Sequence, residues 1–238
     1  MSLYANILEA QKHRRRLFAV LLDPEKTSLE GLNDRTRDAD YVLVGGSTGT
    51  NTAALVRALH RQTDKPVILF PGNVQQFCPE ADALLFLSVL SSRNADCLIG
   101  QHVAAARTIA QSGVETIPTG YILIDGGKRT AVMDATQSEP IRQTDIRQAV
   151  DTAIAAELLG KRLIYLEAGS GALTPVSEHL IRAVREAVSL PLMVGGGIRT
   201  PQMMNTTYNA GADIVVVGNH LEQHPEEIEL FGGMRNEE

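Results

Sequence analysis

The chain has 238 residues, 44% of them hydrophobic, and a formal net charge of −6. This length can bury a sizeable core, and we expect one barrel domain over residues 1–238. The acidic balance argues against a nucleic-acid partner, which would need a dominant basic patch. Two cysteines, Cys78 and Cys97, are too few for a disulfide framework and indicate a reducing compartment, the cytoplasm.

Eight short apolar runs are predicted to form strands. They lack strict polar alternation, which is typical of parallel strands buried on both faces. In chain order the runs are residues 17–22, 41–44, 66–70, 83–87, 119–124, 163–166, 190–194 and 214–217. Segments of helical periodicity lie between most of them, at residues 52–60, 99–111, 144–159, 177–188 and 201–209. This alternation predicts an α/β protein, a (β/α)₈ TIM-like barrel.

The crossover between the third and fourth strands departs from this pattern. Only residues 72–81 are available there, whereas a crossover with its helix needs at least about 10–12 residues and usually more. We therefore expect the third helix to be missing or replaced by an extended segment. Two interpretations remain open: the gap forms an apolar groove for a long hydrophobic ligand, or the crossover is merely shortened.

A second irregular segment, residues 125–143, follows the fifth strand and is too long and polar for a simple turn. Loops after the strands of such a barrel lie at the end that carries the chemistry. We expect this segment to form a mobile cover over the site.

Three glycine clusters follow three successive strands near the C-terminus, at residues 169–171, 195–197 and 218–219. Parallel strands in register bring all three to one edge of the barrel, where the loops after the last strands commonly hold a phosphate. Glycine suits this role because, without a Cβ, its backbone N–H can approach an anion closely. The clusters predict a phosphate cradle.

Asp23 ends the first strand, and Ser47 follows the glycines that end the second. A carboxylate, a hydroxyl and phosphate oxygens together suit Mg²⁺, which takes one or two protein oxygens and completes its shell with substrate and water. The competing interpretation is structural, since Asp followed by Pro is also a good helix N-cap. The six histidines lack metal-ligand spacing, so zinc is not expected.

Glu167 ends the sixth strand, directly before the first glycine cluster. A carboxylate there would repel a phosphate unless it faced the other end of the substrate, which makes it a candidate general base for a hydroxyl group. A structural ion pair is the alternative. Arg199 either adds positive charge near the cradle or forms a surface pair.

Five strand-end motifs carry a resemblance to a known family: LDPEK (22–26), VGGS (44–47), YLEAGSG (165–171), VGGGIR (194–199) and VGN (217–219). They resemble the geranylgeranylglyceryl phosphate synthase family, including its bacterial members. The resemblance runs from residue 20 to about 220, and its most specific element is YLEAGSG. It implies a barrel whose third helix is replaced by an extended segment, and transfer of a prenyl group from its diphosphate to the 3-hydroxyl of sn-glycerol 1-phosphate.

The resemblance also implies roles for individual residues. Mg²⁺ would be held by Asp23 and Ser47, and Glu167 would be the catalytic base. Glycerol phosphate would be bound by Tyr165, Leu166, Glu167, Ala168, Gly169, Ser170, Gly171, Gly196, Gly197, Gly218 and Asn219. A homo-oligomer is expected, and, because the product is a lipid precursor, at most a transient contact with a membrane surface.

Two other functions are compatible with the residues. One is a sugar-phosphate isomerase on the related phosphate-binding barrel, with Asp23 and Asp125 as its acid-base pair. The other is a non-catalytic phosphometabolite-binding protein, which would keep the glycines without needing Glu167. Against the isomerase stand the lack of a half-barrel repeat and the presence of Glu167.

Overall fold

The computed structural model describes residues 2–46 and 51–233, whose eight strands form one closed parallel barrel in the order β1 to β8. Ser47 lies outside the described residues. The strands are β1 (Leu17–Leu22), β2 (Tyr41–Val44), β3 (Val67–Leu69), β4 (Ala83–Val89), β5 (Glu115–Leu123), β6 (Leu163–Glu167), β7 (Leu192–Gly195) and β8 (Ile214–Val217). The predicted barrel is confirmed, and β5 begins four residues earlier than expected.

Alternation along each strand divides the apolar side chains between two cores. In β6, Leu163 and Tyr165 point into the barrel, whereas Ile164 and Leu166 point outward to the helices. Both sets are fully buried. This explains why the strands read as continuous apolar runs in the sequence.

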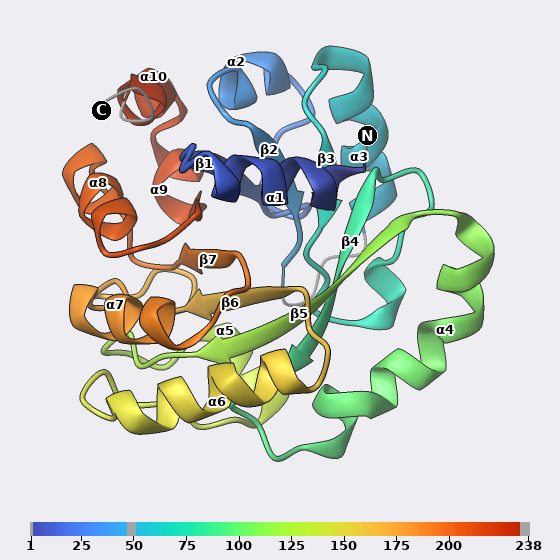
Figure 1. Cartoon of the computed structure of the whole chain (residues 1–238). Coiled ribbons are helices and arrows are strands. Elements are labelled where there is room, and N and C mark those ends of the chain that lie inside the picture. The colour runs from blue at the N-terminus through green and yellow to red at the C-terminus, as the bar shows by residue number, and fades with distance from the viewer. Residues whose placement is uncertain (1, 47–50, 234–238) are drawn as a thin grey trace.

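Helices surround the barrel, as Figure 1 shows. Those between the strands are α2 (Leu32–Thr36), α3 (Thr52–Gln62), α4 (Gln101–Ser112), α5 (Ala131–Thr136), α6 (Ile146–Leu158), α7 (Glu178–Ala187) and α8 (Pro201–Asn209). A π-helical turn, η2 (Asp96–Gly100), leads into α4. After β8 come α9 (Asn219–Gln223), the 3-10 turn η3 (Pro225–Glu227) and α10 (Ile228–Gly233). No helix within residues 2–46 and 51–233 has the length and apolar character needed to cross a membrane.

An N-terminal helix, α1 (Leu3–Lys12), closes the end of the barrel opposite the glycine clusters. It was not among the predicted helices. It crosses in front of the strands in Figure 1. Its first backbone N–H groups, of Leu3 and Tyr4, donate to the carboxylate of Glu115 at the start of β5. Ile7 is fully buried and belongs to the core inside the barrel.

The third crossover contains no α-helix, as predicted. Between β3 and β4 the chain forms only one 3-10 turn, η1 (Val74–Gln76). The side chain of Gln76 holds this turn in place, because its amide donates to the carbonyl of Gly46 at 2.8 Å and its carbonyl accepts from the N–H of Gly72 at 2.7 Å. The outer wall of the barrel is therefore thin beside β3 and β4.

Candidate active site

A cavity of about 450 Å³ lies at the carboxyl ends of the strands. Most of the predicted site residues line it: Asp23, Tyr165, Glu167, Gly169, Ser170, Gly171, Gly196, Gly197, Gly218 and Asn219. Leu166 and Ala168 do not, because both are buried in the outer core. Alternation in β6 gives the reason: it turns Tyr165 and Glu167 inward and Leu166 outward.

The glycine clusters meet in this cavity with backbone conformations and contacts that larger residues would not tolerate. Gly169, Gly171, Gly196 and Gly197 all have positive φ angles, between 66° and 95°. A Cβ on Gly196 would lie 2.6 Å from Oε1 of Glu167 and 2.7 Å from the backbone nitrogen of Gly169. Successive glycines of positive φ can form anion-binding concavities. The clusters lie together where the predicted cradle needs them, and phosphate binding there stays a prediction.

Glu167 is held at the inner edge of the cradle. Its side chain is 6% exposed, and Oε1 accepts a hydrogen bond from the N–H of Gly169 at 2.8 Å. Burial raises the pKa of Glu167 above its ordinary value, against the lowering effects of Tyr165 and the Gly169 N–H. In the described residues the carboxylate has no ion pair, so the structural ion-pair interpretation finds no support there. A buried carboxyl of raised pKa facing a cavity is a good candidate for general base.

Three aromatic rings form the floor beside Glu167. Tyr121 and Tyr165 pack edge to face with centroids 5.5 Å apart, and Phe70 lies 5.3 Å from Tyr165. The hydroxyl of Tyr165 is buried beside the Glu167 carboxylate, and its hydrogen bond to that group lowers the pKa of Glu167 against the effect of burial. Tyr165 and Glu167 thus form one polar pair at the floor of the cavity. Phe70 and Tyr121 were not among the predicted site residues, although Phe70 ends one predicted strand and Tyr121 lies within another.

Asp23 follows β1 and lies at the mouth beside the loop after β8. Its carboxylate is 3.0 Å from the ammonium of Lys26, and its backbone N–H donates to Glu222 at 2.9 Å. A Cβ on Gly46 would lie 2.9 Å from Oδ1 of Asp23, so this carboxylate sits beside the residue that precedes Ser47. Oxygen donors of this kind suit Mg²⁺. Glu222, four residues beyond Gly218 on a short helix, gave no signal in the sequence.

The other two candidate charges have structural partners. The carboxylate of Asp125 accepts from the N–H of Gly127 at 2.9 Å, and Asp125 does not line the cavity. The Arg199 guanidinium donates to the backbone carbonyls of Leu173 and Ala172 and so braces the loop after β6. An acid-base pair of Asp23 with Asp125 is therefore not formed here.

A second, smaller cavity of about 60 Å³ lies between η1 and α4, where the third helix is missing. Phe77, Leu84, Phe86, Ala105 and Ile109 give it apolar walls. It shares the lining residues Pro71, Leu87 and Gln101 with the main cavity. The thin part of the wall thus holds a small apolar cleft adjoining the mouth, and the choice between a ligand groove and a merely shortened crossover stays open.

Residues 125–143 border the mouth. Ala131, Val132 and Ala135 of α5 line the main cavity. The segment is fixed to the loop after β6, because the carbonyl of Gly126 accepts from the N–H of Leu173 at 2.8 Å. Its position agrees with the predicted cover, whereas its mobility stays a prediction.

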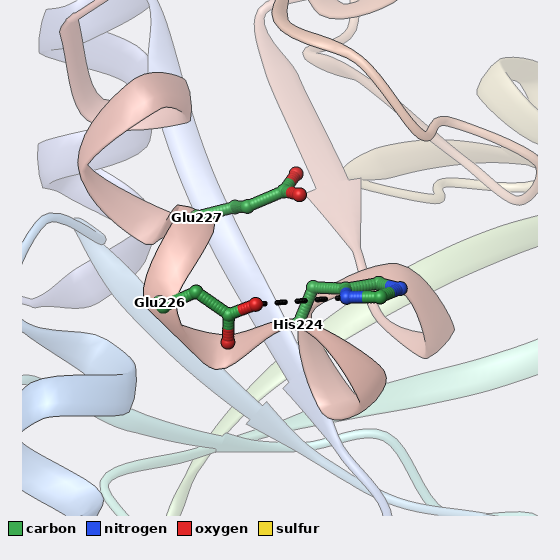
Figure 2. A group of neighbouring side chains, drawn as sticks. All are labelled: His224, Glu226 and Glu227. Carbon is green, nitrogen blue, oxygen red and sulfur yellow. Dashed lines mark ion pairs between the residues drawn. The ribbon is translucent and has the colours of Figure 1, made fainter.

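A cluster of three metal-ligating side chains lies just after α9: His224, Glu226 and Glu227, with ligand atoms within 4.8 Å of one another. Figure 2 shows the ion pair of His224 with Glu226, at 3.6 Å. Glu227 is already engaged by Nε2 of His220 at 2.8 Å. His224 and Glu226 are exposed, and we assign this surface ion-pair network no metal.

Fold and site together define a (β/α)₈ barrel whose mouth combines three glycine clusters, a buried carboxylate and an adjoining apolar cleft. The chain belongs to the PcrB family, whose model matches residues 9–231.

Known proteins similar to this chain agree with that assignment. A geranylgeranylglyceryl phosphate synthase from Zunongwangia profunda is 44% identical over 91% of this chain and 95% of its own length. The synthase from Spirosoma linguale is 46% identical over 89% of this chain and 88% of its own. The crystal structure of the Thermoplasma acidophilum (S)-3-O-geranylgeranylglyceryl phosphate synthase, in complex with sn-glycerol-1-phosphate, superposes with a TM-score of 0.92 at 30% identity, covering 98% of both chains.

Proposed function

We propose that this protein transfers a geranylgeranyl or similar prenyl group from its diphosphate to the 3-hydroxyl of sn-glycerol 1-phosphate, with Mg²⁺ as cofactor. The observation that carries the proposal is the buried carboxylate of Glu167 beside the glycine cradle, in a cavity that adjoins an apolar cleft. Relatives that carry the synthase name at 44–46% identity support the same reaction.

The cradle would hold the acceptor. Backbone N–H groups of the loops after β6, β7 and β8 bind the phosphate of glycerol phosphate, which leaves its hydroxyl end directed to Glu167 and the buried hydroxyl of Tyr165. Fixing the acceptor in this way removes much of the entropic cost of a reaction between two substrates.

Glu167 would act as the base. The bond between the allylic carbon and the diphosphate oxygen breaks with its electron pair leaving on diphosphate. The glycerol oxygen forms the new ether bond, and its proton passes to the carboxylate of Glu167. The raised pKa of this group brings it nearer to neutral pH, which improves it as a proton acceptor.

Asp23 and Ser47 would hold Mg²⁺, which, when bound, neutralises charge on the diphosphate leaving group. The prenyl tail would run from the mouth toward the apolar cleft between η1 and α4, whose volume of about 60 Å³ holds only a short part of a long tail. Each CH₂ that is buried contributes about 0.8 kcal/mol to binding of the donor. Location in the cytoplasm and assembly into a homo-oligomer stay predictions.

Incubation of the purified protein with Mg²⁺, geranylgeranyl diphosphate and sn-glycerol 1-phosphate tests the proposal. We expect a prenyl ether, detected by mass spectrometry, and one diphosphate released for each ether formed. Glycerol 3-phosphate should be much the poorer acceptor, and Glu167→Gln is the matched inactive control. Failure to form an ether with prenyl donors of any length from C10 to C35 would contradict the proposed function.

A further inference from the structure

The phosphate cradle is built mainly from uncharged groups, so the cations around it determine how strongly it attracts a phosphate. In the described part of the chain, the lysine and arginine residues that line the mouth cavity are Lys26, Lys128 and Arg199. Lys26 forms an ion pair with Asp23 at 3.0 Å. The Arg199 guanidinium donates to the carbonyls of Leu173 and Ala172. Lys26 and Arg199 thus already have partners within the protein.

Lys128 differs from the other two in what surrounds its ammonium group. Nζ lies 3.0 Å from the position that a Cβ on Gly171 would occupy. The amide nitrogen of Asn219 lies 3.1 Å from the same point. No carboxylate among residues 2–46 and 51–233 lies within 4.0 Å of the Lys128 ammonium. An unpaired cation therefore stands over one glycine of the cradle.

The orientation of Asn219 strengthens this arrangement. Its amide oxygen accepts a hydrogen bond from the hydroxyl of Ser170 at 2.9 Å, which leaves its NH₂ group turned toward Gly171. Two nitrogen donors, one from the loop after β5 and one from the start of α9, thus converge on the loop after β6. Convergent donors of this kind are what a phosphate oxygen requires.

The backbone that carries Lys128 is anchored to the cradle. The carbonyl of Gly126 accepts from the N–H groups of Leu173 and Thr174, at 2.8 and 3.2 Å. Thr130, on the other side of Lys128, packs against Gly169, where a Cβ would lie 2.5 Å from Cγ2 of Thr130. Because both flanks are held, the ammonium group can reach the cradle with only its own side chain moving.

We propose that Lys128 is a phosphate ligand of the acceptor substrate, which adds the full positive charge that the backbone N–H groups lack. This inference rests on the proposed function, since it assigns the cradle to the phosphate of glycerol phosphate. Lys128 recognises the charged end of the acceptor and takes no part in proton transfer at Glu167. Segment 125–143 therefore supplies a binding residue as well as a wall of the mouth.

The test compares Lys128→Met, Lys128→Arg and the neighbouring control Arg129→Met. Arg129 is exposed and paired with Asp134, and it does not line the cavity. Because it removes a hydrogen bond between two charged groups, Lys128→Met should weaken binding of glycerol 1-phosphate about 10- to 100-fold by calorimetry. KM for glycerol 1-phosphate should rise to the same extent with kcat little changed. Lys128→Arg should restore most of the affinity.

Inorganic phosphate serves as a second probe, so that the two proposals can fail separately. If the wild-type protein forms no prenyl ether but binds phosphate, and Lys128→Met weakens that binding, the proposed reaction fails and the role of Lys128 stands. If the wild-type protein forms the ether and Lys128→Met binds both probes as tightly as wild type, the Lys128 proposal is wrong. An equal loss in Arg129→Met would also overturn it, because the effect would then be one of overall charge.

Discussion

Substitution of Gly196 by alanine tests whether the cradle needs glycine for space or only for backbone conformation. At φ +84° a Cβ costs about 1–2 kcal/mol in the left-handed region. The same Cβ would also lie 2.6 Å from Oε1 of Glu167 and 2.7 Å from the nitrogen of Gly169. Ordinary contacts begin at 3.4 Å, so Glu167 or the loop must move by several tenths of an ångström.

Gly160 provides the matched control. It has a similar φ of +77°, in the turn before β6, but nothing lies within 4 Å of its Cβ position. Gly160→Ala should therefore lose about 1–2 kcal/mol of stability through the backbone alone, measured by chemical denaturation. Gly196→Ala should lose more, because its Cβ also collides with Glu167 and Gly169. Only Gly196→Ala should lose activity. Displacement of reacting groups by up to 1 Å costs about 100-fold, so kcat/KM should fall by that factor, which corresponds to about 2.7 kcal/mol.

The assay measures kcat/KM for both substrates with each variant at a temperature where both are folded. Equal kcat/KM values for Gly196→Ala and Gly160→Ala would refute the reasoning. They would mean that contact of the added Cβ with Glu167 and the loop after β6 does not affect the reaction. A loss confined to the KM for the prenyl diphosphate would refute it as well, since Gly196 is placed on the acceptor side of the mouth.

Other predictions follow from the same geometry. The base must be ionised to accept a proton, so kcat/KM should fall as pH drops through the pKa of Glu167; burial raises this pKa, which puts the fall above pH 4.5. The pH dependence of kcat/KM measures this fall. A midpoint at or below pH 4.5 would contradict the effect of burial. EDTA should abolish turnover while glycerol phosphate binding persists, and full turnover in EDTA would show that the reaction does not need Mg²⁺. Asp23→Asn should raise the Mg²⁺ concentration that gives half-maximal turnover. Phe231→Ala should cost about 3–5 kcal/mol of unfolding free energy, because Phe231 is fully buried and stacks on Phe18. Leu230→Ala, at a side chain 57% exposed, should cost about 0.5 kcal/mol or less, and similar losses for the two would argue that α10 is not docked as described.

The strands and the positions of the glycine clusters could be predicted because they depend on local properties. Apolar runs of four to six residues separated by helical periodicity specify parallel strands, and the shortness of residues 72–81 is enough to predict the loss of one helix. Once the strands are parallel, everything that follows a strand lies at one end of the barrel. The placement of Asp23, Glu167 and the glycines in one cavity follows from that rule.

Other features depend on contacts between segments distant in the chain. Nothing in residues 3–12 predicts that α1 closes the far end of the barrel, since its anchor is Glu115, more than a hundred residues away. Glu222 gave no signal because it reaches Asp23 from a helix beyond the last strand. The side chains of His224, Glu226 and Glu227 likewise come together only because the chain turns between the end of α9 and the start of η3.

The sequence by itself determined the barrel, its missing third helix and the edge at which the glycine clusters meet, because periodicity and spacing are properties of the chain alone. Only the tertiary structure decided which side chains face one another across the mouth. Burial by neighbouring strands gives Glu167 its raised pKa, and the fixing of Gly126 to the loop after β6 brings Lys128 over Gly171. The pKa of Glu167 and the position of Lys128 over the cradle both depend on distances between segments that are far apart in the chain. Those distances are set only when the barrel closes.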